Sequence, residues 1–285
     1  MAKLEFSLNH RYIINETIQN GKISFYKAMD TNFQRYVGIK EICLADNNGH
    51  ATFEKFKNIA QNEINALARV GDMTVRVPCL LETFYDKKDA KIFIVMQWID
   101  GIELTKKMQS ANESQFIQWM IDLCDILAIM DKRNIHHKDI KPANIMIDKA
   151  NQMHLIDFNL SITKPDLTSG TINYLAPEMK SNFANSFTKS DMFSIGVIMY
   201  EFFTKQLPVE GNEYVLKTSR LIKKKNENAW TRFEEPKTIN PNISDELNNI
   251  IVKCMSRSPD DRFENYFILK KELLSARRML KNGRS

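Results

Sequence analysis

Residues 135–147 read IHHKDIKPANIMI. They follow a stretch with helical periodicity and end in a short apolar run, so we expect a loop between a helix and a strand. This loop carries a carboxylate, a cation and an amide at Asp139, Lys141 and Asn144. Phosphoryl transfer needs a carboxylate to orient the attacking hydroxyl, a cation near the transferred phosphate and an oxygen ligand for Mg²⁺. These three residues at this spacing could supply all three from one loop.

The loop resembles the catalytic loop HRDxKxxN of the protein kinase family. Six further stretches match that family in the same order and with similar spacing, across residues 11–275. They are VGIK (37–40), NEINALARV (62–70), LIDFNLS (155–161), YLAPE (174–178), SDMFSIG (190–196) and SPDDRF (258–263). Each stretch alone could occur by chance, but all of them together are specific. The chain therefore resembles the eukaryotic-type serine/threonine protein kinases, and its abundant Asn, Lys and Ile suggest a bacterial member.

The resemblance implies a role for each matching residue. Lys40 is expected to contact the α- and β-phosphates of ATP and to pair with Glu63. Asp139 is expected to orient the acceptor hydroxyl, and Lys141 to neutralise the γ-phosphate. These four residues are the expected catalytic set.

The metal ligands implied by the resemblance are Asn144 and Asp157. Two oxygen donors, together with phosphates and water, suit Mg²⁺, or Mn²⁺ in its place. The cofactors expected are therefore ATP and this divalent cation.

The nucleotide-binding set implied by the resemblance comes from the glycine-loop region, the neighbouring strands and the segment joining the two lobes. It comprises Ile18, Asn20, Gly21, Phe25, Gly38, Lys40, Met96, Gln97, Trp98, Ile99 and Met146. Met146 is expected to form the floor under the adenine, Met96 to guard the back pocket, and residues 97–99 to supply backbone to the base.

The glycine loop is the main departure from the family pattern. Ile18, Asn20 and Ile23 stand where the family has glycines, and only Gly21 lies nearby. Because glycine lets backbone N–H groups approach phosphate closely, we expect a weakened or reshaped cradle. Near the base, Gly38 replaces the usual alanine, and we expect Phe25, in the usual valine position, to take the room.

Two further departures concern regulation. Asn159 replaces the glycine of the DFG motif, and asparagine tolerates the positive φ of that turn better than most residues. Lys138 replaces the arginine that in many kinases holds a phosphate on the activation loop. Since lysine lacks the bidentate fork of arginine, we expect activity without loop phosphorylation. The available acceptors are Ser161, Thr163, Thr168, Ser169 and Thr171.

Other matches imply structural roles. A core column linking the lobes is expected from His137, Phe158, Leu67 and Leu81. Glu178 and Arg262 are expected to form a buried ion pair, and Asp191 to hold the backbone of the catalytic loop.

The elements are unevenly distributed along the chain. Short strand-like runs cover 11–18, 23–30, 36–44, 80–86 and 91–98, with one helix at roughly 51–69. Helical patterns dominate afterwards. We expect an α+β, bilobal protein-kinase fold in one domain over 1–285. Its small β-rich lobe covers about 1–98, the hinge about 97–102 and the helical lobe about 102–285.

Composition narrows the class of protein. The 285 residues are 43% hydrophobic and 26% charged, with a net charge of +5, which is typical of a soluble globular chain. The basic run at 220–225 is better explained as a solvated helix face than as a nucleic-acid site, so no nucleic acid is expected. The longest apolar run, 193–203, is too short to span a bilayer, and the N-terminus has no apolar signal core.

The four cysteines show no CxxC pair, and the patterns around Cys79 and Cys124 suggest buried thiols. We therefore expect a reducing, cytoplasmic setting, in the source cell or in a host cell into which the protein is delivered.

Lys141 and Thr171 favour serine or threonine in a protein as the acceptor, and the APE segment argues against small-molecule phosphotransferases. Two alternatives stay open. One is a pseudokinase that binds nucleotide as a scaffold, which the missing glycines favour. The other is a kinase-fold enzyme with an atypical acceptor.

Overall fold

The computed structural model describes most of the chain, in seven stretches. These are residues 11–19, 21–44, 50–71, 73–158, 173–180, 187–208 and 233–282. The chain divides into two compact units. The N-terminal unit comprises Met1–Gly101 and His154–Asn159, and the C-terminal unit comprises Ile102–Met153 and Leu160–Ser285.

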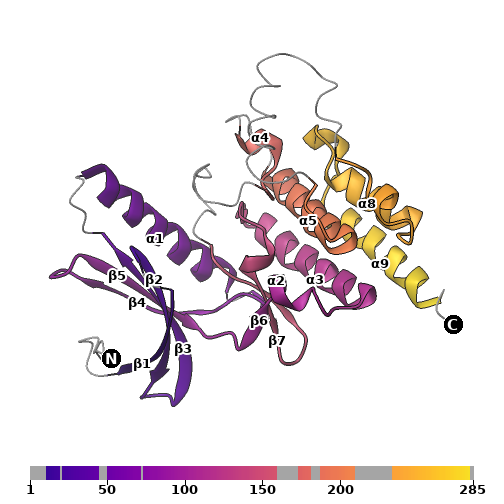
Figure 1. The fold of residues 1–285 in the computed structure, drawn as a ribbon. Coiled ribbons are helices and arrows are strands. Elements are labelled where there is room, and N and C mark those ends of the chain that lie inside the picture. The colour runs from indigo at the N-terminus through magenta and orange to yellow at the C-terminus, as the bar shows by residue number, and fades with distance from the viewer. Residues whose placement is uncertain are drawn as a thin grey trace. The chain divides into compact units, whose positions relative to one another are not determined.

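An antiparallel sheet of five strands forms the body of the N-terminal unit, in the order β1-β2-β3-β5-β4. The strands are β1 (Tyr12–Gln19), β2 (Ile23–Asp30), β3 (Arg35–Cys43), β4 (Leu80–Asp86) and β5 (Lys91–Gln97). One helix, α1 (His50–Val70), joins β3 to β4 and packs against β3, β4 and β5 (Figure 1). The predicted strands and helix are thus confirmed, with ends shifted by one residue at most.

The alternation of side chains across the sheet separates its two faces. One face carries the buried cluster of Tyr12, Tyr26, Ala28, Val37, Ile39, Phe93 and Val95. In the register of β2, β3 and β5, Phe25 is opposite Lys40, and Gly38 is opposite Met96. These four residues therefore point to the other face, where the predicted nucleotide-binding side chains of the strands come together.

The C-terminal unit is mainly helical. Its longer helices are α3 (Glu113–Asp131), α5 (Phe187–Thr204), α8 (Asp245–Cys254) and α9 (Tyr266–Asn282) (Figure 1). The short elements after β5 are β6 (Gly101–Glu103), α2 (Leu104–Lys107), η1 (Pro142–Asn144), β7 (Ile145–Asp148), β8 (Met153–Leu155), α4 (Pro177–Lys180), α7 (Pro236–Ile239) and η3 (Pro259–Asp261). Gly101 of β6 and the last two residues of β8 belong to the N-terminal unit. The three short strands pair in the order β6-β7-β8. A unit built on a β-sheet and a mainly helical unit agree with the predicted α+β class.

Local sequence explains where α3 and α8 begin and how α5 packs against α8. The side chains of Asn112 and Ser244 cap α3 and α8 by accepting backbone N–H bonds. Helix α5 is buried almost all round, as its apolar run predicts. A Cβ at Gly196 would lie 2.7 Å from the Cβ of Cys254, so glycine is required where α5 approaches α8.

The cysteine prediction was wrong for Cys79. Cys124 is buried, but Cys79 is only partly buried, because it lies in the connection just before β4 rather than inside a strand. All four cysteines are free thiols. Within the described part of the chain, no helix is long and apolar enough to cross a membrane.

Candidate active site

The first group of functional side chains, here called the lysine cluster, lies within the N-terminal unit and consists of Lys40, Glu63 and Asp157. Lys40 Nζ lies 2.7 Å from Glu63 Oε2 and 2.9 Å from Asp157 Oδ1. Strand β3 supplies the lysine, α1 the glutamate, and the segment after β8 the aspartate. The expected pairing of Lys40 with Glu63 is present in the structure.

Burial strengthens the electrostatic interactions within this cluster. Lys40 is 6% exposed and Glu63 is 1% exposed. Burial alone would lower the pKa of Lys40, but the nearby carboxylates of Asp157 and Glu63 outweigh it and raise that pKa above its usual value. Lys40 is therefore protonated at neutral pH. Burial raises the pKa of the Glu63 carboxyl, and the charge of Lys40 acts in the opposite direction.

The second group, here called the aspartate cluster, lies within the C-terminal unit and consists of Asp139, Lys141 and Asn144. Lys141 Nζ donates to Asp139 Oδ2 over 2.8 Å. Asn144 Nδ2 donates to the backbone oxygen of Asp139 over 2.8 Å and to its Oδ2 over 2.9 Å. The three residues predicted from the loop sequence are thus in direct contact.

The other carboxylate oxygen of Asp139 is the unusual atom of this cluster. Oδ1 is buried and has no hydrogen-bond partner among the described residues. A buried acceptor without a donor costs stability, so such an atom in a native site needs an explanation. A hydrogen-bond donor beside Oδ1 would satisfy this acceptor.

Asp191 holds the loop that carries Asp139. Its carboxylate accepts the backbone N–H of His137 over 2.9 Å and that of Lys138 over 2.8 Å. Lys138 has a φ of 63°, so this double contact stabilises a backbone conformation that lysine rarely adopts. Burial raises the pKa of Asp191 to about 7. The expected role of Asp191 in holding this loop agrees with these contacts.

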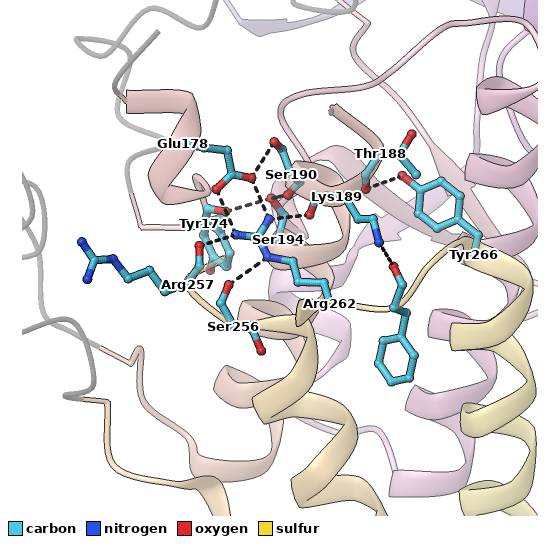
Figure 2. A network of polar contacts seen from close by, with 11 residues as sticks. Tyr174, Glu178, Thr188, Lys189, Ser190, Ser194, Ser256, Arg257, Arg262 and Tyr266 are labelled. Carbon is cyan, nitrogen blue, oxygen red and sulfur yellow. Dashed lines mark hydrogen bonds and ion pairs between the residues drawn. The ribbon is translucent and has the colours of Figure 1, made fainter. Parts of the chain in front are cut away.

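A buried guanidinium supports the surrounding helices (Figure 2). Arg262 binds both carboxylate oxygens of Glu178, at 2.6 and 2.9 Å, as expected. It also donates to the backbone oxygens of Lys189 and Ser256. Ser190 Oγ donates to Glu178 over 2.8 Å. Since Ser190 precedes Asp191, this network fixes the start of α5 from which Asp191 reaches the loop.

The glycine-loop region makes its own internal hydrogen bonds. The N–H of Gly21 donates to Ser24 Oγ over 3.1 Å, and Ser24 Oγ donates to the Gly21 carbonyl over 3.0 Å. Ile18 is 49% exposed and lies at an irregularity in the pairing of β1 with β2. The N–H of Gly21 is thus already used within the turn.

Gln97 ends β5, and the connection after it carries Trp98 and Ile99. The N–H of Gln97 donates to the Cys79 carbonyl over 2.9 Å, so it is not free for a base. Ile99 is buried, and Trp98 stacks on Phe25 with ring centroids 6.2 Å apart. In the C-terminal unit, Met146 is half-buried on β7.

Several predicted residues lie outside the described stretches. These are Asn20, Asn159, the loop acceptors Ser161, Thr163, Thr168, Ser169 and Thr171, and the basic run at 220–225. Of the predicted core column, His137, Phe158 and Leu67 are buried and Leu81 is partly buried. That the column links the lobes stays a prediction.

Sequence reasoning missed two residues. Ser24 stabilises the turn at Gly21 through two hydrogen bonds. The only indication of this role in the sequence is a serine three residues after a glycine, a common spacing for side-chain bonds in turns. Phe187 lies under Lys138, whose Nζ is 3.9 Å from the ring centroid. No local pattern connects residues almost fifty positions apart.

Comparison with known proteins decides the family. The protein kinase domain family matches residues 12–274. The chain belongs to this family. The kinase domain is 27% identical over 271 residues to a probable serine/threonine-protein kinase of Clostridium acetobutylicum, covering 90% of this chain and 38% of that protein. It is 24% identical over 290 residues to the serine/threonine-protein kinase PknB of Mycolicibacterium smegmatis, covering 94% and 43%. The chain thus spans about two fifths of the length of these relatives.

The kinase domain implies a divalent cation, and the donor atoms present fit one. Asn144 directs its amide nitrogen to Asp139, which leaves its amide oxygen for a cation. Asp157 is 34% exposed although Lys40 binds one of its oxygens. The described residues contain no group of three or more His, Cys, Asp or Glu side chains that could hold a metal ion by itself.

Proposed function

We propose that this protein is an ATP-dependent serine/threonine protein kinase. The observation that carries the proposal is the aspartate cluster, in which Lys141 binds one carboxylate oxygen of Asp139 and the other is buried with no partner among the described residues. A hydroxyl that donates to Oδ1 would satisfy this acceptor. The names of the bacterial relatives support serine or threonine as the acceptor.

In the proposed reaction, the acceptor oxygen attacks the γ-phosphorus of ATP. A bond forms between them, and the bond from the γ-phosphorus to the bridging oxygen of ADP breaks. Asp139 Oδ1 orients the hydroxyl and receives its proton. Lys141 lies beside the same carboxylate and carries the positive charge that would compensate the transferred phosphoryl group.

The lysine cluster is proposed to position the nucleotide. Lys40, held by Glu63, would contact the α- and β-phosphates. Asn144 and Asp157 would hold Mg²⁺, or Mn²⁺ in its place, and the cation would supply charge neutralisation on the phosphates. Because Gly21 uses its N–H internally, we expect phosphate binding to depend more on Lys40 than on backbone donors.

The rest of the proposed assignment concerns the base and the domain. The base would contact Ile18, Phe25, Gly38, Met96 and the backbone of residues 97–99, with Met146 as its floor. Asn20 and Gly21 complete the proposed nucleotide-binding set. We propose that residues 1–285 form a single kinase domain with its hinge at 97–102. The four free thiols suit a reducing compartment such as the cytoplasm.

The test is incubation of the purified protein with γ-labelled ATP, Mg²⁺ and generic protein acceptors, with acid hydrolysis to identify the labelled amino acid. Label on serine or threonine supports the proposal. Nucleotide binding without transfer, for wild type and Asp139→Asn alike, would assign the chain to the pseudokinase scaffolds instead. Label on a non-protein acceptor alone would support the kinase-fold enzyme with an atypical acceptor.

A further inference from the structure

Phe25 and Gly38 interlock on the face of the N-terminal sheet that carries Lys40. In the β2–β3 register Phe25 pairs with Lys40 and Lys27 pairs with Gly38, so Phe25 is the diagonal neighbour of Gly38. A Cβ on residue 38 would lie 2.8 Å from Cζ and 3.3 Å from Cε2 of the Phe25 ring. Real Cβ atoms essentially never approach so closely. The ring therefore fills the volume of a side chain at position 38.

Two side chains border the ring and limit where it can move. Trp98 stacks on Phe25 with the ring planes 21° apart. Met96 Cγ lies 3.4 Å from the same Cβ position at residue 38, and Met96 is buried. Lys27 Nζ in turn lies 5.0 Å from the centre of the Trp98 ring. A methyl group at position 38 would therefore push the Phe25 ring away from the sheet rather than along it.

The place of the ring connects this packing to the ligand. Phe25 is directly opposite Lys40, which the proposed function assigns to the phosphates. A nucleotide with its phosphates at Lys40 would place its base farther along the same face, toward Gly38 and Met96. The flat ring of Phe25 is then the part of the face that a purine would meet, and aromatic rings pack well against such surfaces.

We propose that Phe25 and Gly38 act as one size-complementary pair that shapes the base-binding surface and determines its affinity for purine nucleotides. This proposal rests on the proposed function and deepens it. In this chain the aromatic ring replaces bulk that would otherwise be shared by two aliphatic side chains. A larger side chain at position 38 then requires a smaller side chain at position 25.

The test compares wild type with Gly38→Ala, Phe25→Val and the double variant, by calorimetric titration with ADP and by KM and kcat for ATP. Gly38→Ala should raise the Kd about tenfold or more, because overpacking displaces the ring into the space of the base. Phe25→Val alone should raise it less. The double variant should return to within about threefold of wild type, and the effect on KM should exceed that on kcat.

Val37→Ile is the matched control. It also adds one methyl group to β3, but in the buried cluster of the opposite face. It should lower the melting temperature while the Kd for ADP stays unchanged, which separates strain in the sheet from an effect on the ligand. An equal loss of ADP affinity in Val37→Ile would contradict the proposal.

The outcomes separate this inference from the proposed function. Suppose that the wild type binds ADP and transfers phosphate, but that the two substitutions have additive effects or none. The proposed Phe25–Gly38 pair would then be wrong, and the proposed function would stand. Wild type that binds no nucleotide at millimolar concentration would overturn both. Restoration by the double variant is the result that supports the pair.

Discussion

The lysine cluster and the aspartate cluster contain similar residue types but differ in burial and in how their charges are paired. In the lysine cluster Lys40 and Glu63 are buried, and the cation is held by two carboxylates at 2.7 and 2.9 Å. The aspartate cluster balances one carboxylate against one cation and leaves a buried oxygen of Asp139 without a partner in the described chain. The first is an arrangement of charges that depend on one another for stability. In the proposed reaction the second offers an acceptor to the substrate hydroxyl, so we expect its loss to affect chemistry rather than folding.

Asp139→Asn is the sharpest test of this difference. The amide can no longer receive a proton, so the rate of phosphoryl transfer should fall by about a thousandfold or more. The Kd for Mg²⁺-ATP and the melting temperature should stay near those of wild type, because the substitution removes no ion pair of the lysine cluster. Single-turnover transfer and calorimetric titration measure the two effects. Transfer at the wild-type rate would show that Asp139 is not the catalytic carboxylate.

Lys40→Met should affect both chemistry and stability. Removing the cation leaves Glu63 buried beside Asp157 without compensation, which typically costs about 3–5 kcal/mol. We expect a lower melting temperature, weaker binding of ATP and a loss of transfer. Adding Glu63→Gln should recover much of the stability but none of the transfer. If Lys40→Met melted like wild type, the cluster would not depend on its charges.

Arg262→Met extends the comparison to a buried pair with no proposed contact to ligand. The guanidinium binds Glu178 and two backbone oxygens, so we expect a loss of about 3–5 kcal/mol in the free energy of unfolding. The double variant Arg262→Met/Glu178→Gln should be more stable than Arg262→Met alone, because no unpaired charge remains. Denaturant unfolding measures both. Equal stability of the single and double variants would contradict the role assigned to the pair.

Sequence predicted the parts of the molecule that depend on local pattern. The strand at 23–30 and the strand at 80–86 were predicted to the residue, because both have apolar runs bounded by turns. The residues of the aspartate cluster were found because they lie within six positions of one another. The pair of Lys40 with Glu63 was expected only from the resemblance to kinases.

What sequence did not show depends on contacts between distant side chains. The ring of Phe187 under Lys138 and the bond of Gln97 to Cys79 follow from the packing of separate elements. Neither leaves a periodic signal. The unpartnered oxygen of Asp139 is likewise a property of the folded loop, and no spacing of residues could have indicated which of its two oxygens stays open.

A pH dependence should follow from Asp191. Burial raises its pKa to about 7 from a usual value of 3.8, so the folded state retains a proton that the unfolded state has lost between these values. Its contribution to stability therefore decreases as pH rises from about 4 to 7. Activity should move the other way, because only the ionised carboxylate accepts both N–H groups of the loop. We expect kcat to rise up to tenfold per pH unit below 7 and then level off.

Asp191→Asn is the control for this pH dependence, since an amide does not titrate. The difference in unfolding free energy between wild type and Asp191→Asn should change between pH 4 and 7 and be constant above. A difference that does not vary with pH in that window would show that Asp191 does not titrate there.

The smallest effect is expected from loss of activation-loop phosphate. Lys138 is the residue that would bind such a phosphate, but its ammonium lies 3.9 Å from the ring centroid of Phe187, and burial lowers its pKa. A lysine engaged in this way, without the fork of arginine, is a poor phosphate ligand. Phosphatase treatment together with alanine at Ser161, Thr163, Thr168 and Ser169 should therefore change kcat by less than about twofold.

The matched variant for this prediction is Lys138→Arg, which restores the bidentate fork at the same backbone position. The contact with Phe187 and the absence of a guanidinium are our reasons for expecting that kcat does not depend on loop phosphate. If they are correct, kcat of the variant Lys138→Arg/Phe187→Leu should depend on loop phosphate, whereas kcat of the wild type should not. Intact melting temperatures would show that the fold survives the changes. A large loss of rate in the four-alanine variant with an unchanged melting temperature would mean that loop phosphate controls this kinase domain in spite of Lys138. The aspartate cluster would then need an added charge to become active, and its difference from the lysine cluster would be one of regulation as well as of burial.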